Sequence, residues 1–160
     1  DFSRGRYHNF TTWIDLRNYW QIRPRITLAQ RTMIWMNEGK DIQRYYIGGS
    51  WGIRGYRWSE IKGRKMVMLN HELRFPFAQK LEMNFKSGSF WLAPIRGAIF
   101  LDLGNAWEQE FPGFLSSTGL GFRAALMGAL VFRLDLGWKA EHVNIRPQEK
   151  FVQFFFGWDF

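Results

Sequence analysis

The sequence predicts an all-β protein, a transmembrane antiparallel β-barrel, and three observations support this fold class. About seven stretches alternate apolar and polar side chains at the two-residue period of a β-strand. The apolar positions hold mainly Phe, Leu, Ile and Trp, and aromatic residues make up 19% of the chain. The mean hydropathy is nevertheless low, at −0.30. Aromatic side chains at two membrane interfaces around a polar interior would combine these properties.

The first two predicted strands, residues 9–20 and 25–36, have the weakest alternation. In 9–20 an apolar row opposes a mixed row. In 25–36 the apolar row is interrupted by Gln30 and Thr32. The apolar positions of these two stretches are Phe10, Ile14, Leu16, Ile26, Leu28 and Ile34.

Residues 65–76 and 94–107 alternate more clearly. In both stretches one row is apolar, apart from His71, and the opposite row carries Glu72 in the first stretch and Asp102 in the second. The apolar rows are Val67, Leu69, Leu73 and Phe75, and then Ile95, Ile99, Leu101 and Leu103.

The last three predicted strands are residues 116–125, 130–139 and 151–160, with a tight turn at Gly128 between the first two. Ten residues tilted by about 45° cover roughly the ~25 Å apolar band of an outer membrane. The polar rows, with Arg123, Arg133 and Asp135, then face a hydrated interior, because Arg or Lys facing lipid at mid-depth costs ~2–4 kcal/mol. A soluble, half-buried antiparallel sheet is the alternative that alternation leaves open.

Several other classes of protein receive no support from the sequence. No apolar run approaches the ~18–20 residues of a membrane helix. The net charge is +8, but Lys and Arg are dispersed, so we expect no nucleic-acid partner. There is no Cys, and the three His are too far apart in the sequence for a metal site. We therefore expect no enzyme, no catalytic residues, no metal and no cofactor.

Residues 38–63 are the longest segment without strand alternation, and they hold a glycine-rich stretch at 47–56, IGGSWGIRGY. Its glycines allow sharp turns and close approach to other backbone. A structureless connection of this length is usually functional. The conformation of residues 77–93 is left open, either as an extension of two strands or as a loop.

Five motifs in order resemble the outer-membrane assembly barrels, the BamA/TamA-like bacterial surface antigen superfamily. They are Gly48-Gly49 with Ile53-Arg54-Gly55-Tyr56, then NHELRFP at 70–76, FLDLGNAW at 100–107, STGLGFR at 117–123, and the terminal strand ending at Phe160. The match runs from about Tyr46 to Phe160. Tyr56 stands where relatives often carry Phe.

The resemblance implies a barrel of about sixteen strands, of which this chain would be the C-terminal seven or so. Upstream strands and periplasmic POTRA modules would precede it. The 38–63 loop would fold into the lumen, where Arg54 would pair with Glu72 and Asp102. With Gly48, Gly49, Gly55 and Tyr56, these residues would form a loop lock. Since Arg54 would keep both acids ionised, they do not suit the general acid of a glycosidase.

The resemblance also implies a function, which is the insertion of outer-membrane proteins by β-augmentation at a lateral seam. The seam strand would be the last one, with Val152, Phe154, Phe156, Gly157, Trp158 and Phe160. The alternative is a barrel that anchors or secretes an upstream domain, as in two-partner secretion transporters and patatin-like lipase fusions. Expected partners are the lipid bilayer, client outer-membrane proteins and accessory envelope proteins or the rest of a longer chain. The expected location is the outer membrane of a Gram-negative-type envelope or its organelle equivalent.

Overall fold

The computed structural model describes residues 8–79, 81–85, 88–92, 94–126, 130–141 and 149–158, and these residues are organised in β-strands. Seven strands are long: β1 (Asn9–Arg23), β2 (Ile26–Gly39), β5 (Lys65–Ala78), β8 (Ile95–Trp107), β9 (Leu115–Leu126), β10 (Leu130–Glu141) and β11 (Glu149–Trp158). Four are short: β3 (Tyr45–Ile47), β4 (Ile61–Gly63), β6 (Leu81–Phe85) and β7 (Gly88–Leu92).

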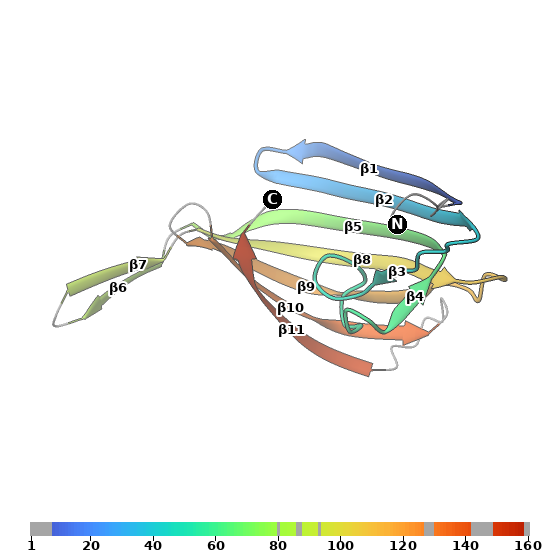
Figure 1. Cartoon of the computed structure of the whole chain (residues 1–160). Coiled ribbons are helices and arrows are strands. Elements are labelled where there is room, and N and C mark those ends of the chain that lie inside the picture. The colour runs from blue at the N-terminus through green and yellow to red at the C-terminus, as the bar shows by residue number, and fades with distance from the viewer. Residues whose placement is uncertain are drawn as a thin grey trace, which may run out of the picture.

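The seven long strands form one antiparallel sheet in the order β1-β2-β5-β8-β9-β10-β11, so each strand pairs with the next long strand along the chain. The sheet is curved like a trough and is not closed on itself, which leaves β1 and β11 as its two edges (Figure 1). The predicted all-β class and the seven antiparallel strands are therefore confirmed. The strand ends differ from the predicted ones by up to three residues.

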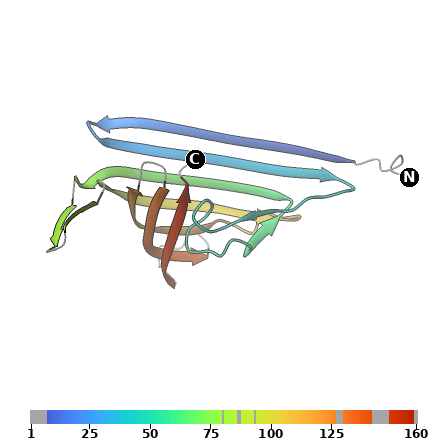
Figure 2. The same cartoon turned by 60° about the vertical axis from the view of Figure 1, so that its left-hand side comes forward.

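The two faces of the sheet differ in polarity as the alternation predicted. We call the face that carries the segment between β2 and β5 the inner face, and the opposite one the outer face (Figure 2). On the outer face, Ile99 is 50% exposed and Leu134 is 37% exposed. On the inner face, Asp102 and Asp135 are buried. Exposed apolar residues outside and buried charged residues inside are the pattern of a membrane barrel wall and not of a soluble core.

The segment between β2 and β5 lies against the inner face and has secondary structure of its own (Figure 1). Its predicted start at residue 38 is wrong, because β2 continues through Gly39. The segment also contains the antiparallel pair β3–β4, with Ile47 opposite Ile61. Both isoleucines are buried in a core cluster on the inner face, together with Met33, Ile53, Tyr56, Met66, Met68 and Ala106. Burial of these apolar side chains explains why the segment is ordered against the wall.

The question that the sequence left open for residues 77–93 has a clear answer in the described part of that range. The strand β5 ends at Ala78, and β6 and β7 then pair with each other as a separate two-stranded sheet. They project beyond the end of the large sheet (Figure 1).

Among the described residues there is no helix long and apolar enough to cross a membrane.

Three predicted features lie wholly or partly outside the described residues. These are the turn at Gly128, most of the connection between β10 and β11, and Phe160 at the end of the last strand. Trp158 is the last residue of β11, but its side chain is also outside the described part.

Candidate functional site: the buried Arg54 cluster

Glycines shape the loop that carries Arg54. The backbone N–H of Gly49 donates to the carbonyl of Tyr56 at 2.7 Å, which closes the loop into a compact turn. Gly55 has a φ of 84°, in the left-handed region that favours glycine. A Cβ at Gly55 would lie 2.5 Å from the ring of Phe151 on β11, so the site has no room for a side chain. The loop therefore approaches the wall as closely as a backbone can.

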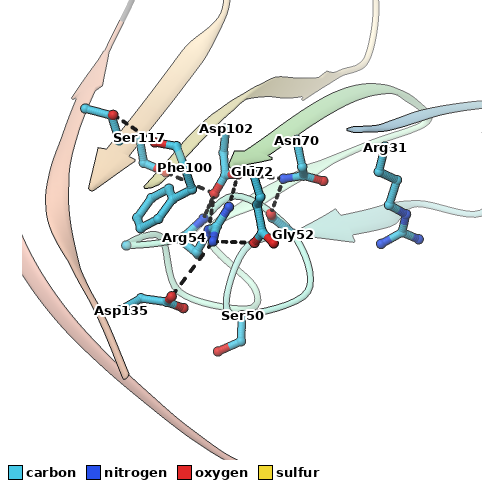
Figure 3. Close-up of polar contacts among 12 residues, drawn as sticks. Arg31, Ser50, Gly52, Arg54, Asn70, Glu72, Phe100, Asp102, Ser117 and Asp135 are labelled. Atoms are coloured by element: carbon cyan, nitrogen blue, oxygen red, sulfur yellow. Dashed lines mark hydrogen bonds and ion pairs between the residues drawn. The ribbon is translucent and has the colours of Figure 1, made fainter. Parts of the chain in front are cut away.

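Arg54 is almost fully buried, at 2% exposed, and its guanidinium bridges two carboxylates of neighbouring strands (Figure 3). Its Nε donates to Asp102 Oδ2 at 2.6 Å, and its Nη2 donates to Asp102 Oδ1 at 2.5 Å. Its Nη1 donates to Glu72 Oε1 at 2.7 Å. The guanidinium also lies 3.6 Å from the centre of the Phe100 ring, a cation–π contact. Arg54 therefore makes two hydrogen bonds to a carboxylate on β8 and one to a carboxylate on β5, and its guanidinium stacks on an aromatic ring.

The two carboxylates have further partners on the inner face. Asp102 accepts a bond from the Arg54 backbone N–H at 3.1 Å, from Asn70 Nδ2 at 2.9 Å and from Ser117 Oγ at 3.3 Å. Glu72 accepts bonds from Arg74 at 2.8 Å and from Arg123 at 2.7 and 2.8 Å. Buried carboxylates with this many donors are held in one orientation. The strands of the sheet therefore position both acceptors of Arg54.

The charge around Arg54 favours its ionised form. Burial by itself would lower the pKa of the guanidinium, but Asp102, Glu72 and Asp135 outweigh that effect and hold the pKa above its ordinary value. Asp135 on β10 lies 3.8 Å from the Arg54 Nη1 and accepts a 2.7 Å bond from Arg133. The cluster therefore combines charges from β5, β8 and β10 around a single loop cation.

The loop also contacts the last two strands of the sheet. Tyr56 Oη donates to the Ala140 carbonyl on β10 at 3.1 Å. Gln153 on β11 accepts a bond from the Gly55 N–H at 3.0 Å and donates to Ser50 Oγ at 3.1 Å. The loop is thus attached to the inner face from β5 across to β11.

The structure brings some of the sequence-predicted site residues together and separates others. Arg54, Glu72 and Asp102 form one cluster, whereas Gly48 and Gly49 shape the loop away from the charges. Gly55 and Tyr56 face β11 and β10. Three seam residues point away from the cluster on the outer face, with Val152 73%, Phe154 62% and Phe156 51% exposed. Gly157 lies in β11 on the face of Phe155, and the Trp158 side chain and Phe160 lie outside the described residues.

Several residues of the cluster were not assigned to it from the sequence. They are Asn70, Phe100, Ser117, Arg123, Arg133, Asp135 and Gln153. All seven occupy inward positions of their strands. The alternation of the sequence therefore places them on the inner face, but it does not show which inward residues contact Arg54. Within the described part of the chain, no group of three or more His, Cys, Asp or Glu is arranged to hold a metal ion.

Comparison with known proteins agrees with the fold and with the motifs. The model of the Omp85 superfamily domain matches residues 3–160, nearly the whole chain. A search of curated proteins found no match. The curved antiparallel sheet, its apolar outer face and the family match lead to one conclusion: the chain belongs to the Omp85 superfamily, whose domains are characteristic of outer-membrane proteins and form barrels that insert or secrete proteins.

Proposed function

We propose that this chain forms the C-terminal wall of a barrel that inserts client β-barrel proteins into the outer membrane. The mechanism is β-augmentation, in which a client strand adds to an open strand edge through main-chain hydrogen bonds. The observation that carries the proposal is the attachment of the glycine-rich loop to β11 in a chain that the Omp85 superfamily model matches: Gln153 accepts a bond from the Gly55 N–H and donates to Ser50. In the proposed mechanism the seam is the edge of β11 that does not pair with β10.

The chemistry of an open edge suits this role. An unpaired edge strand presents a row of backbone N–H and C=O groups that can template another strand. The outward side chains of β11, Val152, Phe154 and Phe156, are the most exposed apolar residues on this part of the sheet. A client strand added here would continue the apolar outer face and would keep its own apolar side chains in lipid.

We assign the Arg54 cluster the role of a loop lock that holds the loop in one geometry against the wall. Breaking a buried ion pair by removing one partner costs about 3–5 kcal/mol, even where the intact pair adds little net stability. Since the same loop bonds to Gln153 on β11, the lock also braces the seam strand from inside. Movement of β11 away from the wall would have to break these contacts or carry the loop with it.

Site-specific photo-crosslinking in lipid vesicles tests the seam. The full-length protein would carry a photoreactive residue at Val152 or Phe154, and a β-barrel client would be added during assembly. We expect capture of the client at these positions. The matched control is Ile99, which is also exposed on the outer face but lies on β8, three strands away. Equal capture at Ile99, or assembly without capture on β11, would count against the seam.

The loop lock has its own test, which is Arg54→Ala in the same assembly reaction. We expect the yield of protease-resistant client to fall, while Arg44→Ala, which removes an exposed arginine paired with Glu108, leaves it unchanged. If the Arg54→Ala protein folds and the client yield stays normal, the loop lock has no role in client assembly. If the wild-type protein assembles no client, secretion or anchoring of an attached domain becomes the better assignment.

A further inference from the structure

Three arginines lie side by side across the inner face of the sheet. Arg96 on β8 is opposite Arg123 on β9, and Arg123 is opposite Arg133 on β10. Like charges directly opposite one another on a sheet repel and are destabilising. The row lies near the strand ends at which β9 leads into β10, away from the ends that carry the loop. Such a row requires neutralisation from nearby groups.

The carboxylates near the row provide only part of that neutralisation. Glu72 is shared among Arg54, Arg74 and Arg123 at 2.7–2.8 Å, with Arg133 at 3.9 Å. A single carboxylate has one negative charge and four lone-pair positions, so it cannot balance four guanidinium groups. Arg123 also has a buried Nε–H that finds no acceptor among the described residues. The middle arginine of the row is therefore also the one whose Nε–H lacks an acceptor among the described residues.

Two arginines of this row, Arg123 and Arg133, border a cavity of about 650 Å³ on the inner face. Six arginines line the cavity: Arg17, Arg31, Arg54, Arg74, Arg123 and Arg133. Among the described residues, four carboxylates pair with these six, namely Asp15, Glu72, Asp102 and Asp135. Six positive charges minus four negative charges leave an excess of two. Ser50, Asn70 and Gln30 add neutral polar side chains to the lining.

We propose that this cavity binds a phosphate monoester. A phosphomonoester carries a charge of about −1.5 to −2 at neutral pH, which matches the excess of two, and it offers three acceptor oxygens. Guanidinium groups bind phosphate through paired N–H donors, and several of them arranged around one site can each contact a different oxygen. The volume exceeds that of phosphate alone and leaves space for part of the group that bears it.

Two sources share this chemistry, free phosphate compounds and lipid headgroups that end in a phosphomonoester. Both would be bound by the same arginines through the phosphate group. Phosphate binding here requires only the charges and the cavity of the inner face, and not client insertion.

Isothermal titration calorimetry on the full-length protein in zwitterionic detergent tests the proposal. The first probe is inorganic phosphate at constant ionic strength, and the second is phosphatidic acid in mixed micelles. We expect saturable binding of phosphate. Arg123→Gln removes charged hydrogen-bond donors to the phosphate, so it should weaken binding tenfold or more. Displacement of phosphate by the lipid identifies a headgroup site, and failure of the lipid to compete identifies a site for soluble phosphates.

Two further variants make the outcome decisive. Arg74→Gln changes an arginine whose side chain is 36% exposed, and it should weaken phosphate binding even if Arg123→Gln does not fold. Arg44→Gln removes the same charge outside the cavity and should leave binding unchanged. Absence of saturable binding, or equal weakening by Arg44→Gln, would overturn the proposal, because the affinity would then reflect net charge alone.

Discussion

Replacement of Arg54 by alanine gives the sharpest test of the inner-face cluster. The change removes all three side-chain donors to Asp102 and Glu72 and leaves two carboxylates that are 0% and 6% exposed. Removing one partner of a buried ion pair costs about 3–5 kcal/mol. The strand ladders do not involve the Arg54 side chain, so we expect the loss to fall on the attachment of the loop and not on the sheet.

At about 1.4 kcal/mol for each factor of ten, this loss raises the opening equilibrium of the loop by roughly two to four orders of magnitude. Hydrogen exchange measures that equilibrium residue by residue. The reporting amides are the N–H groups of Gly49 and Gly55, which are bonded to Tyr56 and Gln153 in the closed loop. Their protection should fall in Arg54→Ala, while amides in the middle of β8 and β9 keep theirs.

A matched control tests whether the effect depends on the burial of the ion pair or only on its short distance. Arg44 and Glu108 form an ion pair of 2.6 Å, as short as the contacts of Arg54, but their side chains are 54% and 46% exposed. Exposed pairs contribute little because water and salt screen them. Arg44→Ala should therefore leave loop protection unchanged. Unaltered protection of Gly49 and Gly55 in Arg54→Ala would refute the reasoning, since the buried charges would then not hold the loop.

Three other predictions concern the loop and the wall. Gly55→Ala should destabilise the attachment of the loop by about 1–3 kcal/mol, because the new side chain would have a positive φ and would collide with Phe151. Limited proteolysis of the loop measures this destabilisation, and adding Phe151→Ala should restore only part of the lost stability. Tyr56→Phe removes the bond to the Ala140 carbonyl and should cost about 1 kcal/mol by the same assay, with intact protection arguing that the ring alone is sufficient. Ile99→Arg places a charge on the outer face and should lower the unfolding free energy in vesicles by ~2–4 kcal/mol. Trp58→Arg, at a 67% exposed position between β3 and β4, should not, and equal effects would contradict a lipid-facing outer surface.

The sequence predicted the long strands because an alternating pattern runs over about ten residues in each, although it is weakest in the first two. A two-residue period repeated over ten residues identifies both the strand and its faces, and Ile99 and Asp102 accordingly lie on opposite sides of β8. The short strands β3 and β4 have three residues each, too few to show a period. They exist because Ile47 and Ile61 are buried against the wall, a tertiary effect that no local pattern contains.

The centre of the cluster was expected from motifs, but its surroundings were not. Arg54, Glu72 and Asp102 have expected roles within their motifs, whereas Phe100, which begins the same motif as Asp102, has none. Its place under the guanidinium depends on the depth to which the loop enters the trough. Gln153 is similar, because its pairing with Gly55 requires the curvature that brings β11 toward the loop. Register and curvature are properties of the whole sheet, and single motifs do not encode them.

The attachment of the loop has a consequence for the order of folding. Arg54 meets Glu72 after 18 residues and Asp102 after 48, but Tyr56 meets Ala140 only after 84 residues and Gly55 meets Gln153 only after 98. Contacts between residues so far apart along the chain form slowly, since a long stretch must first be ordered. The loop can therefore reach its final position only when β10 and β11 have joined the sheet, and its completed contacts mark a wall that has finished assembling.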